Sequence, residues 1–345
     1  MKLPKAYAKS VRKQSIDMTL SVNPLGCSPR ALQAVRKSTR EAVSLYPDAE
    51  ILTGSIAQKF NVSEDNILLG NGSEMLIKLV SQAFVRKGEI AAVEEGSFFL
   101  FSKEPLISGG RIRFITVGSV KKMKQRPAIL FIANPTTPGG IDRSDEALCA
   151  TIDAIDPKIA VIDEANAEFR SGTMITRLRT RKNLIILRTF SKAFGLAGLR
   201  IGIAFGNADL IETMNEYIQP FPLTAPALAA AGAALADDEF IRKTRRFVAE
   251  ERAFLTKALT KRGFSVSPSV TNNLFVSRSD NAAVVKALEQ NGVSVIDGTF
   301  FPGNKIPGFR ISLKDRQTNR LFLQKLDEAL ACVTQYNLLP SKEVL

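Results

Sequence analysis

The sequence predicts an α/β protein with a mostly parallel, seven-stranded sheet in a large domain and a smaller α+β domain beside it. Three observations predict this class. From about residue 66, short apolar strands alternate with helix-length segments, and such strands need crossover connections. After about residue 237 a long helical segment and short strands follow instead. The length of 345 residues also exceeds that of one ordinary domain. We therefore assign residues 44–236 to the large domain and residues 1–43 and 237–345 to the small domain.

The strands of the large domain are short apolar runs, expected at 67–70, 90–94, 114–117, 128–133, 159–165, 183–188 and 201–205. Helices are expected from Ser73 after the first run and near Ser97 after the second. Ligands of such sheets collect at the carboxyl ends of the strands. We therefore expect the functional residues of this chain at those strand ends.

The small domain has a different pattern. Residues 28–42 predict a helix because Ser28 is a suitable N-cap and Pro29 suits the first helical position. Residues 237–262 predict a long helix, and short strands are expected around 263–266, 273–277 and 309–313. We expect the helix at 28–42 to pack with this C-terminal region.

The composition excludes several classes of protein. With 45% apolar and 23% charged residues it is globular. The apolar runs are strand-sized and the basic N-terminus lacks an apolar core, so we predict no membrane span, no secretory signal and a cytoplasmic location. Cys27, Cys149 and Cys332 are too widely spaced for a disulfide framework or a metal motif. The absence of histidine excludes Ser-His-Asp catalysis and histidine-ligated metals, and we expect no metal.

The net charge of +13 could attract nucleic acid, a membrane or small anionic substrates. The basic residues are scattered, and the two densest clusters, 121–126 and 177–182, contain no aromatic residues. We interpret both clusters as solvated loops, with nucleic-acid binding as the minority interpretation.

Lys192 is the candidate nucleophile. It comes just after a predicted strand that ends at Arg188. Burial at a strand end and nearby cations both lower the pKa of an amine, which makes it a better nucleophile toward an aldehyde. The hydroxyls of Thr189 and Ser191, together with Arg200, could bind a phosphate. Taken alone, a surface lysine on a solvated turn is the commoner explanation of such a segment.

Other strand ends carry suggestive residues. Asp163 ends a wholly apolar strand, where a carboxylate needs a cationic partner such as a protonated pyridine nitrogen, although a helix-capping role is an equal alternative. The turn at 70–72 and the helix that opens at Ser73 bring free N–H groups to one point, which suits a phosphate. The segment 131–141 by itself indicates only a loop.

Together these segments resemble fold-type I enzymes that depend on pyridoxal 5'-phosphate (PLP). The segment RTFSKAFGLAGLRIG at 188–202 is close to a verbatim match, and SVNPLGCSP (21–29) and LYPD (45–48) are similar to an N-terminal signature. The chain is most similar to the histidinol-phosphate aminotransferase family and to its relative, threonine-phosphate decarboxylase. The resemblance covers roughly residues 17–333.

The resemblance implies a role for each matched residue. Lys192 would hold PLP as a Schiff base and carry the proton between the substrate Cα and the cofactor C4' atom. Asp163 would keep the pyridine nitrogen protonated, so that the ring acts as an electron sink. Phe98 would stack on the face of the ring. The cofactor phosphate would be held by the backbone groups of Gly72, Ser73 and Glu74 together with Thr189, Ser191 and Arg200.

The resemblance also implies a partner subunit and a substrate site. Tyr46, in LYPD, would reach the cofactor phosphate of the neighbouring subunit, which makes the enzyme a homodimer. Arg310, in GFRISL, would bind the anionic group of the substrate, and Asn23, in SVNPLG, is assigned to the same site. The implied partners are a small anionic amino compound and a 2-oxo acid. Without the resemblance, Arg310 would be taken for a solvated residue at a strand edge.

Two positions depart from the family pattern near the cofactor. Thr137 stands where an asparagine usually donates to the phenolic oxygen of PLP, and Asn166 stands where a tyrosine does so. Donors to that oxygen stabilise its anion and lower the pKa of the lysine–cofactor linkage. We therefore expect this linkage to titrate higher than in typical relatives, unless Asn166 or a water substitutes for the usual donors.

A third departure concerns the substrate. Ile296 replaces a second arginine of the family, which leaves Arg310 alone for a phosphate or carboxylate unless Lys305 or Lys314 compensates. This change weakens histidinol phosphate as the substrate more than it weakens PLP chemistry. Residues 297–303 and SVNPLG also resemble the decarboxylase.

Three functions stay open at this point. The first is an aminotransferase that moves an amino group from glutamate to a 2-oxo acid or to imidazole-acetol phosphate. The second is a PLP-dependent decarboxylase or lyase of a phosphorylated amino acid. The third is a PLP-fold protein that has lost catalysis and serves as a binding or regulatory module. The retention of Lys192, Asp163 and Arg200 argues against the third.

Overall fold

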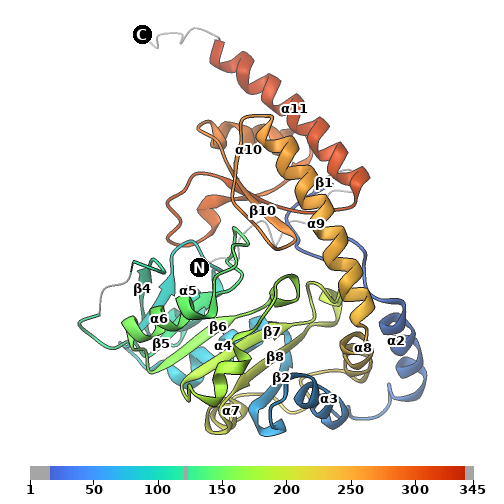
Figure 1. Ribbon diagram of the computed structural model, residues 1–345, viewed down its shortest axis with the longest axis vertical. Helices are drawn as coiled ribbons and strands as arrows, with labels where there is room; N and C mark the ends of the chain where they lie inside the picture. Colours follow the sequence, from blue (N-terminus) through green and yellow to red (C-terminus); the bar gives the residue numbers. More distant parts are fainter. Residues whose placement is uncertain (1–15, 120–122, 339–345) are drawn as a thin grey trace.

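The computed structural model describes residues 16–119 and 123–338. A large sheet covered by helices forms the lower body in Figure 1, a smaller sheet forms the upper unit, and helix α9 (Asp238–Thr260) runs between them. The basic cluster at 121–126 lies partly outside the described residues. Within those residues, none of the helices combines the length and the apolar character of a membrane span.

The large sheet has seven strands in the order β2-β8-β7-β6-β5-β3-β4. Strand β8 is antiparallel to both of its neighbours, and the remaining strands share one direction. The prediction of a mostly parallel, seven-stranded sheet is confirmed. The strands are β2 (Ile67–Asn71), β3 (Ile90–Glu94), β4 (Arg111–Ile115), β5 (Ile129–Ala133), β6 (Ile159–Asp163), β7 (Leu184–Thr189) and β8 (Ile201–Gly206).

Both faces of this sheet are buried, which explains why its strands are continuous apolar runs. In β6, Val161 faces one core and Ile162 faces the other, as the period of two requires. One core is completed by α4 (Gly72–Phe84), α5 (Leu100–Ile107) and α7 (Ala208–Asn215). The other core is completed by α3 (Glu50–Phe60), α6 (Asp145–Ile155) and α8 (Ala225–Leu235).

Helix α2 (Pro29–Glu41) begins as expected but packs elsewhere. The Ala31 N–H donates to Ser28 Oγ at 3.0 Å, which is the predicted N-cap. Ala31 is fully buried in the same core as Ala230 of α8, and the alanines of α8 let the two helices approach closely. The helix therefore packs against the large-domain core, not with the C-terminal region as expected. The boundary at 43/44 itself stays a prediction.

The small unit has its own core, in which Met18, Leu255 and Phe309 are buried. Its antiparallel sheet has the order β12-β13-β10-β9, and β1 pairs in parallel with β11. The predicted strands are β9 (Ser265–Val266), β10 (Asn273–Ser277) and β13 (Phe309–Ser312). The strands that were not predicted have two residues each: β1 (Ile16–Asp17), β11 (Val293–Ser294) and β12 (Ile296–Asp297). The helices are α9, α10 (Asn281–Gln290) and α11 (Arg316–Leu338).

Short 3₁₀ helices connect these elements. They are η1 (Glu64–Asn66), η2 (Ala167–Phe169), η3 (Met174–Arg179), η4 (Ala197–Leu199) and η5 (Gly298–Phe300). The sequence predicts a solvated loop for the basic cluster at 177–182, but residues 177–179 belong to helix η3.

Candidate active site

The predicted site residues gather at one edge of the large sheet. Asp163 ends β6, and Lys192 follows the end of the neighbouring strand β7. Gly72 follows β2, while Arg200 precedes the antiparallel strand β8 that lies between β7 and β2. Because β8 runs in the opposite direction, its start lies beside the ends of its neighbours. Residues distant in sequence therefore meet at this edge.

Lys192 is half-buried at the end of β7. Burial lowers the pKa of its amine to about 8, and the positive charges of Arg310 and Arg200 act in the same direction. The negative charge of Asp163 opposes this shift. A large fraction of the amine is consequently unprotonated at mildly alkaline pH, which is the form that attacks a carbonyl carbon.

Asp163 is 8% exposed. Burial raises the pKa of its carboxyl to about 6, against the hydrogen bond from Ala165 and the charge of Lys192. The Ala165 N–H donates to Asp163 Oδ1 at 2.9 Å. A carboxylate in this position would be stabilised by a further cationic or N–H group placed against it.

An anion site is built where α4 begins. No side chain caps the first N–H groups of α4, and Arg200 Nη2 lies 3.2 Å from Glu74 Oε2 in the first turn of that helix. A Cβ added at Gly72 would lie 2.7 Å from Arg200 Nη2 and would displace the guanidinium, and the φ of +78° at this position also favours glycine. Thr189 Oγ1 and Ser191 Oγ lie 3.0 Å apart at the end of β7. These donors and the helix end suit a phosphate.

The remaining predicted cofactor contacts lie on loops around this edge. Phe98 is half-buried, with ring centroids 5.0 Å from Phe99 and 5.8 Å from Phe101. Asn166 Oδ1 is buried without a hydrogen-bond partner in the structure. Thr137 is half-buried in the loop after β5. A buried amide with an unused polar atom marks a place where a ligand group can bind, so the residues present fit the predicted cofactor.

Residues 13–326 match the family model of class I and II aminotransferases. The chain belongs to this aminotransferase family. It is 37% identical over 292 residues to a histidinol-phosphate aminotransferase of Mesorhizobium japonicum, covering 79% of each chain.

Solved structures agree on the fold. A PLP complex of the histidinol-phosphate aminotransferase from Sinorhizobium meliloti has a TM-score of 0.84 and 24% identity, covering 93% of this chain and 92% of that one. An L-threonine-O-3-phosphate decarboxylase from Porphyromonas gingivalis has a TM-score of 0.80 and 22% identity, covering 92% and 99%. The fold prediction for a PLP-dependent aminotransferase is thereby confirmed, with both relatives named in the sequence analysis represented.

In this aminotransferase, Arg310 lies on β13 of the small unit and is 6% exposed. Its Nη2 donates to the carbonyl oxygen of Thr19, and its guanidinium carbon lies 5.9 Å from the centroid of the Phe301 ring. Arg310 therefore is a buried, positioned cation, unlike the solvated strand-edge residue that the sequence alone would suggest. Of the two lysines considered as substitutes for the missing arginine, Lys305 pairs with Glu95 at 2.9 Å. Burial and the charge of Arg310 lower the pKa of the other, Lys314.

Asn23 connects the N-terminal loop to the turn that contains Lys192 and to helix α9. Its Nδ2 donates to the Ala193 carbonyl oxygen at 2.7 Å and to Thr244 Oγ1 of α9 at 3.0 Å. A Cβ at Gly195 would collide with the carbonyl oxygen of Gly26, so the N-terminal loop lies directly against the turn of Lys192. Both amide hydrogens of Asn23 are used in this link, a role that the sequence analysis did not include.

Tyr46 lies on the surface of the chain. It is 82% exposed, and its ring stacks on Phe221 with centroids 4.7 Å apart. Val43 and Ile51 nearby in sequence are also strongly exposed apolar residues. The predicted contact with a partner subunit stays a prediction.

A layer of buried ion pairs supports the site, and the sequence analysis missed it. Glu164 follows Asp163 and is fully buried, and its two carboxylate oxygens accept hydrogen bonds from Met174 N and Thr173 Oγ1, both at 2.6 Å. Arg188 Nη2 pairs with Glu168 Oε1 at 2.7 Å, and Arg188 Nη1 lies 4.0 Å from Glu164.

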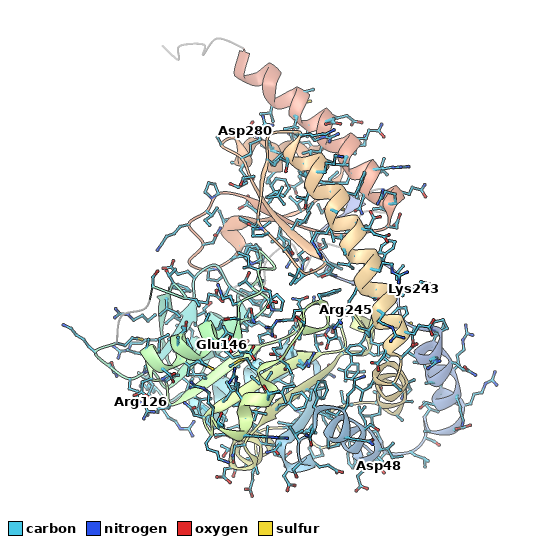
Figure 2. The ribbon with its side chains drawn as sticks, in the orientation of Figure 1. Asp48, Arg126, Glu146, Lys243, Arg245 and Asp280 are labelled. Carbon is cyan, nitrogen blue, oxygen red and sulfur yellow. The ribbon has the colours of Figure 1, made fainter. Side chains whose placement is uncertain are left out.

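Helix α9 is bound to this layer. Arg245, labelled in Figure 2, donates to the carbonyl oxygens of Glu168 and Arg170. The cation connects the small unit to the backbone just beyond Asp163. Among the described residues, no group of three His, Cys, Asp or Glu side chains could hold a metal ion.

Proposed function

We propose that this protein binds PLP at Lys192 and transfers an amino group between an anionic amino compound and a 2-oxo acid, as a histidinol-phosphate aminotransferase does. The observation that carries the proposal is the pairing of Lys192, whose pKa is lowered to about 8, with the buried Asp163 on the neighbouring strand. PLP chemistry requires an amine with a lowered pKa, a buried acid and a phosphate-binding site close to both.

When bound, PLP would supply an electron sink for negative charge that develops at the substrate Cα. Lys192 would hold the cofactor and move the proton at the substrate Cα. Asp163 would keep the proton on the ring nitrogen, because its carboxylate gains a cationic partner there. The ring would lie against Phe98, with Asn166 and Thr137 near its phenolic oxygen.

The cofactor phosphate would be bound at the start of α4. The N–H groups there, the Arg200 guanidinium and the hydroxyls of Thr189 and Ser191 form the donor set. Glu74 now pairs with Arg200, so we infer that this carboxylate turns away when the phosphate binds. Tyr46 would complete the set from a partner subunit, because its side chain is 82% exposed on the surface of its own chain. The assembly would then be a homodimer.

Arg310 would bind the phosphate or carboxylate of the substrate. In the register of the small sheet, Ile296 pairs directly with Arg310. Ile296 is 1% exposed, so this position offers no second cation. Lys314 is the remaining candidate for a second cation at the substrate. The charge of Arg310 lowers the pKa of Lys314, which indicates that the two cations are close to each other. A site with one arginine also suits decarboxylation of a phosphorylated amino acid, which is the alternative function.

The test is a half-reaction with a panel of amino donors. Purified, PLP-saturated protein is mixed with glutamate, histidinol phosphate or threonine phosphate in the absence of an oxo acid. Loss of the visible cofactor band with a stoichiometric yield of the oxo product supports the aminotransferase. Release of carbon dioxide from threonine phosphate supports the decarboxylase.

A complementary test addresses the cofactor site directly. Borohydride reduction followed by peptide mapping should place the cofactor on Lys192. An unmodified Lys192 in saturated protein contradicts the proposal, and protein that takes up no PLP supports a binding module that has lost catalysis.

A further inference from the structure

A polar cavity lies at the edge of the large sheet opposite the candidate active site. It is lined by Asn66, which precedes β2, by Lys182, which lies just before β7, and by Asn207, which follows β8. Lys192 lies beyond the other ends of these strands. Strands of five or six residues span roughly 16–20 Å, so the cavity is separate from the candidate active site. Its volume of about 640 Å³ is in the range of small-molecule sites.

The cavity is positively charged because of how the basic segment 177–182 is arranged. Arg177 pairs with Glu146 at 2.9 Å, and Arg181 pairs with Asp153 at 2.8 Å, so these cations are neutralised by α6. Arg179 and Lys182 line the cavity instead, and no carboxylate of the described chain forms an ion pair with either.

The residues that line the cavity include no aspartate or glutamate. Arg179 and Lys182 are exposed, and two cations at a cavity whose lining has no acid attract an anion.

Hydrogen-bond donors accompany these cations. Asn207 is the N-cap residue of α7, and its side chain makes no capping hydrogen bond. The Leu210 N–H donates to the Asn207 carbonyl oxygen, so the N–H groups of Ala208 and Asp209 are the donors at this helix start. Asp209 is also an acid in the first turn, but it does not line the cavity.

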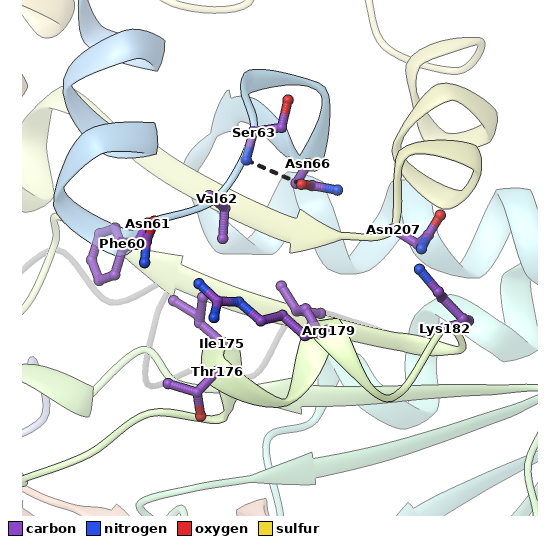
Figure 3. A pocket seen from close by; sticks show the side chains of 11 residues that line it. Phe60, Asn61, Val62, Ser63, Asn66, Ile175, Thr176, Arg179, Lys182 and Asn207 are labelled. Atoms are coloured by element: carbon purple, nitrogen blue, oxygen red, sulfur yellow. Dashed lines mark hydrogen bonds between the residues drawn. The ribbon is translucent and has the colours of Figure 1, made fainter.

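The amine of Lys182 points toward Asn207 in Figure 3, whereas the guanidinium of Arg179 extends toward the side of Phe60 and Asn61. The amine of Lys182 and the start of α7 therefore lie together on one side of the cavity, which suits an anion with several oxygens, and Arg179 lies on the other side.

An apolar wall completes the cavity. Phe60, Val62, Ile175 and Leu178 line it beside the polar groups. Phe60 is half-buried, and its ring also contacts Phe205, with centroids 5.1 Å apart, which fixes its position. A preformed aromatic surface next to cations fits a ligand that has a flat ring as well as a charged head.

We propose that this cavity binds an organic phosphate monoester that carries a flat ring. The phosphate lies beside Lys182 near the start of α7, and the ring lies against Phe60 and Ile175, on the side of the cavity where Arg179 lies. A phosphate, with more acceptor oxygens and more negative charge than a carboxylate, suits an amine beside the N–H groups of a helix start better than a carboxylate does. The site is independent of the proposed transfer reaction, since none of its residues belongs to the candidate active site.

The test is calorimetric titration of PLP-loaded protein, dialysed free of unbound PLP, with phenyl phosphate, inorganic phosphate and benzoate as separate probes. We expect saturable binding of phenyl phosphate, at least about tenfold tighter than either of the others. The double variant Arg179→Gln/Lys182→Gln should weaken phenyl phosphate binding at least about tenfold. The double variant Arg177→Gln/Arg181→Gln removes the same charge from the same segment outside the cavity, and its affinity should stay within about twofold of the parent.

A second variant guards against a folding artefact. Thr176→Glu places a carboxylate at the exposed side of the cavity and should abolish binding while leaving the thermal unfolding midpoint unchanged. Equal losses in the two double variants would overturn the proposal, because general charge would then explain the binding. Binding that survives in Arg179→Gln/Lys182→Gln but disappears in Arg310→Gln would place the phosphate in the active site and overturn it as well. Benzoate as tight as phenyl phosphate would contradict the assignment to a phosphate.

Discussion

Asp163 and Glu164 are adjacent buried acids, but their carboxyls have different numbers of partners within the protein. On the side of Glu164, each carboxylate oxygen accepts a hydrogen bond and Arg188 lies nearby. On the side of Asp163, the carboxyl accepts one backbone hydrogen bond and faces the amine of Lys192. Both acids are buried, yet one is neutralised by its own chain while the other is left for a ligand.

The difference teaches how a single strand end serves both stability and chemistry. Buried charges that are fully partnered hold a structure in one arrangement. Burial raises the pKa of both acids, so the difference lies in their partners: a buried acid with few partners marks a place where a ligand completes the set. The four predictions below change one side at a time, beginning with the largest expected effect.

Replacing Asp163 by asparagine should separate activity from stability. The variant loses the acid that holds a proton on the ring nitrogen, so the transfer rate should fall on the order of 10³-fold. The cofactor-free variant should nevertheless be more stable than the parent near neutral pH. Burial raises the pKa of Asp163 to about 6, so the parent is destabilised as pH rises from about 3.8 through about 6 and this carboxyl ionises.

The gain should reach at most about 3 kcal/mol near pH 7.5 and should nearly vanish near pH 4, as urea unfolding at the two values measures. Asparagine removes this cost because it stays neutral at every pH. A cofactor-free variant that is less stable than the parent at neutral pH would contradict the comparison.

Replacing Arg188 by methionine should have the opposite profile. It leaves Glu164 and Glu168 with less positive charge inside the protein, so we expect a loss of about 3–5 kcal/mol at neutral pH. Burial raises the pKa of Glu164, so the loss should grow as pH rises and this carboxyl ionises. Denaturant unfolding measures it, and the transfer rate per folded molecule should stay within a few-fold of the parent. A variant as stable as the parent would show that the layer does not support the site.

The reactivity of Lys192 should titrate near its shifted pKa. The rate at which cofactor-free protein captures PLP should rise about tenfold per pH unit and level off above a midpoint of about 8. Stopped-flow absorbance gives this profile, and Lys192→Ala is the blank. Asp163→Asn should move the midpoint lower, because the carboxylate is one of the groups that raise this pKa. A midpoint near 10.5, the ordinary value of a lysine, would contradict the shift.

The smallest effect is expected at the two departures near the phenolic oxygen. Thr137→Asn and Asn166→Tyr each restore a usual family donor, so each should lower the pKa of the lysine–cofactor linkage, by about one unit or less. A visible-absorbance pH titration of PLP-loaded protein measures it. If the parent already titrates as low as typical relatives, then Asn166 or a water supplies the missing hydrogen bond.

The sequence predicted the large sheet well because its physical signal is strong. Strands buried on both faces are continuous apolar runs, and polar residues at their ends stand out against them. Strands β1, β11 and β12 have two residues each and carry no periodicity that a pattern could detect. The helix of Ser28 has a clear start signal, but a cap does not encode which core the helix joins, and it packs against α8.

The site was predictable only where strand order brings residues together. Lys192, Asp163 and Gly72 lie at the ends of strands that belong to one sheet, so topology alone places them at one edge. The link made by Asn23 depends on a contact with α9 of the small unit, which no local pattern contains. The hydrogen bonds of Glu164 come from Thr173 and Met174 in the same unit, but they depend on how the segment after β6 folds back, which the pattern does not show. The basic segment 177–182 shows the same limit, because sequence does not reveal which of its cations find an acid.

The loop that contains Asn23 has a consequence for how the protein is made. Its amide hydrogens are shared between Ala193, beside the reactive lysine, and Thr244, far along the chain. During translation, the complete set of Asn23 hydrogen bonds therefore cannot form until the helix that carries Thr244 has left the ribosome. We expect a nascent chain that stops before this helix to lack a firm wall beside Lys192, however completely its large sheet has already formed.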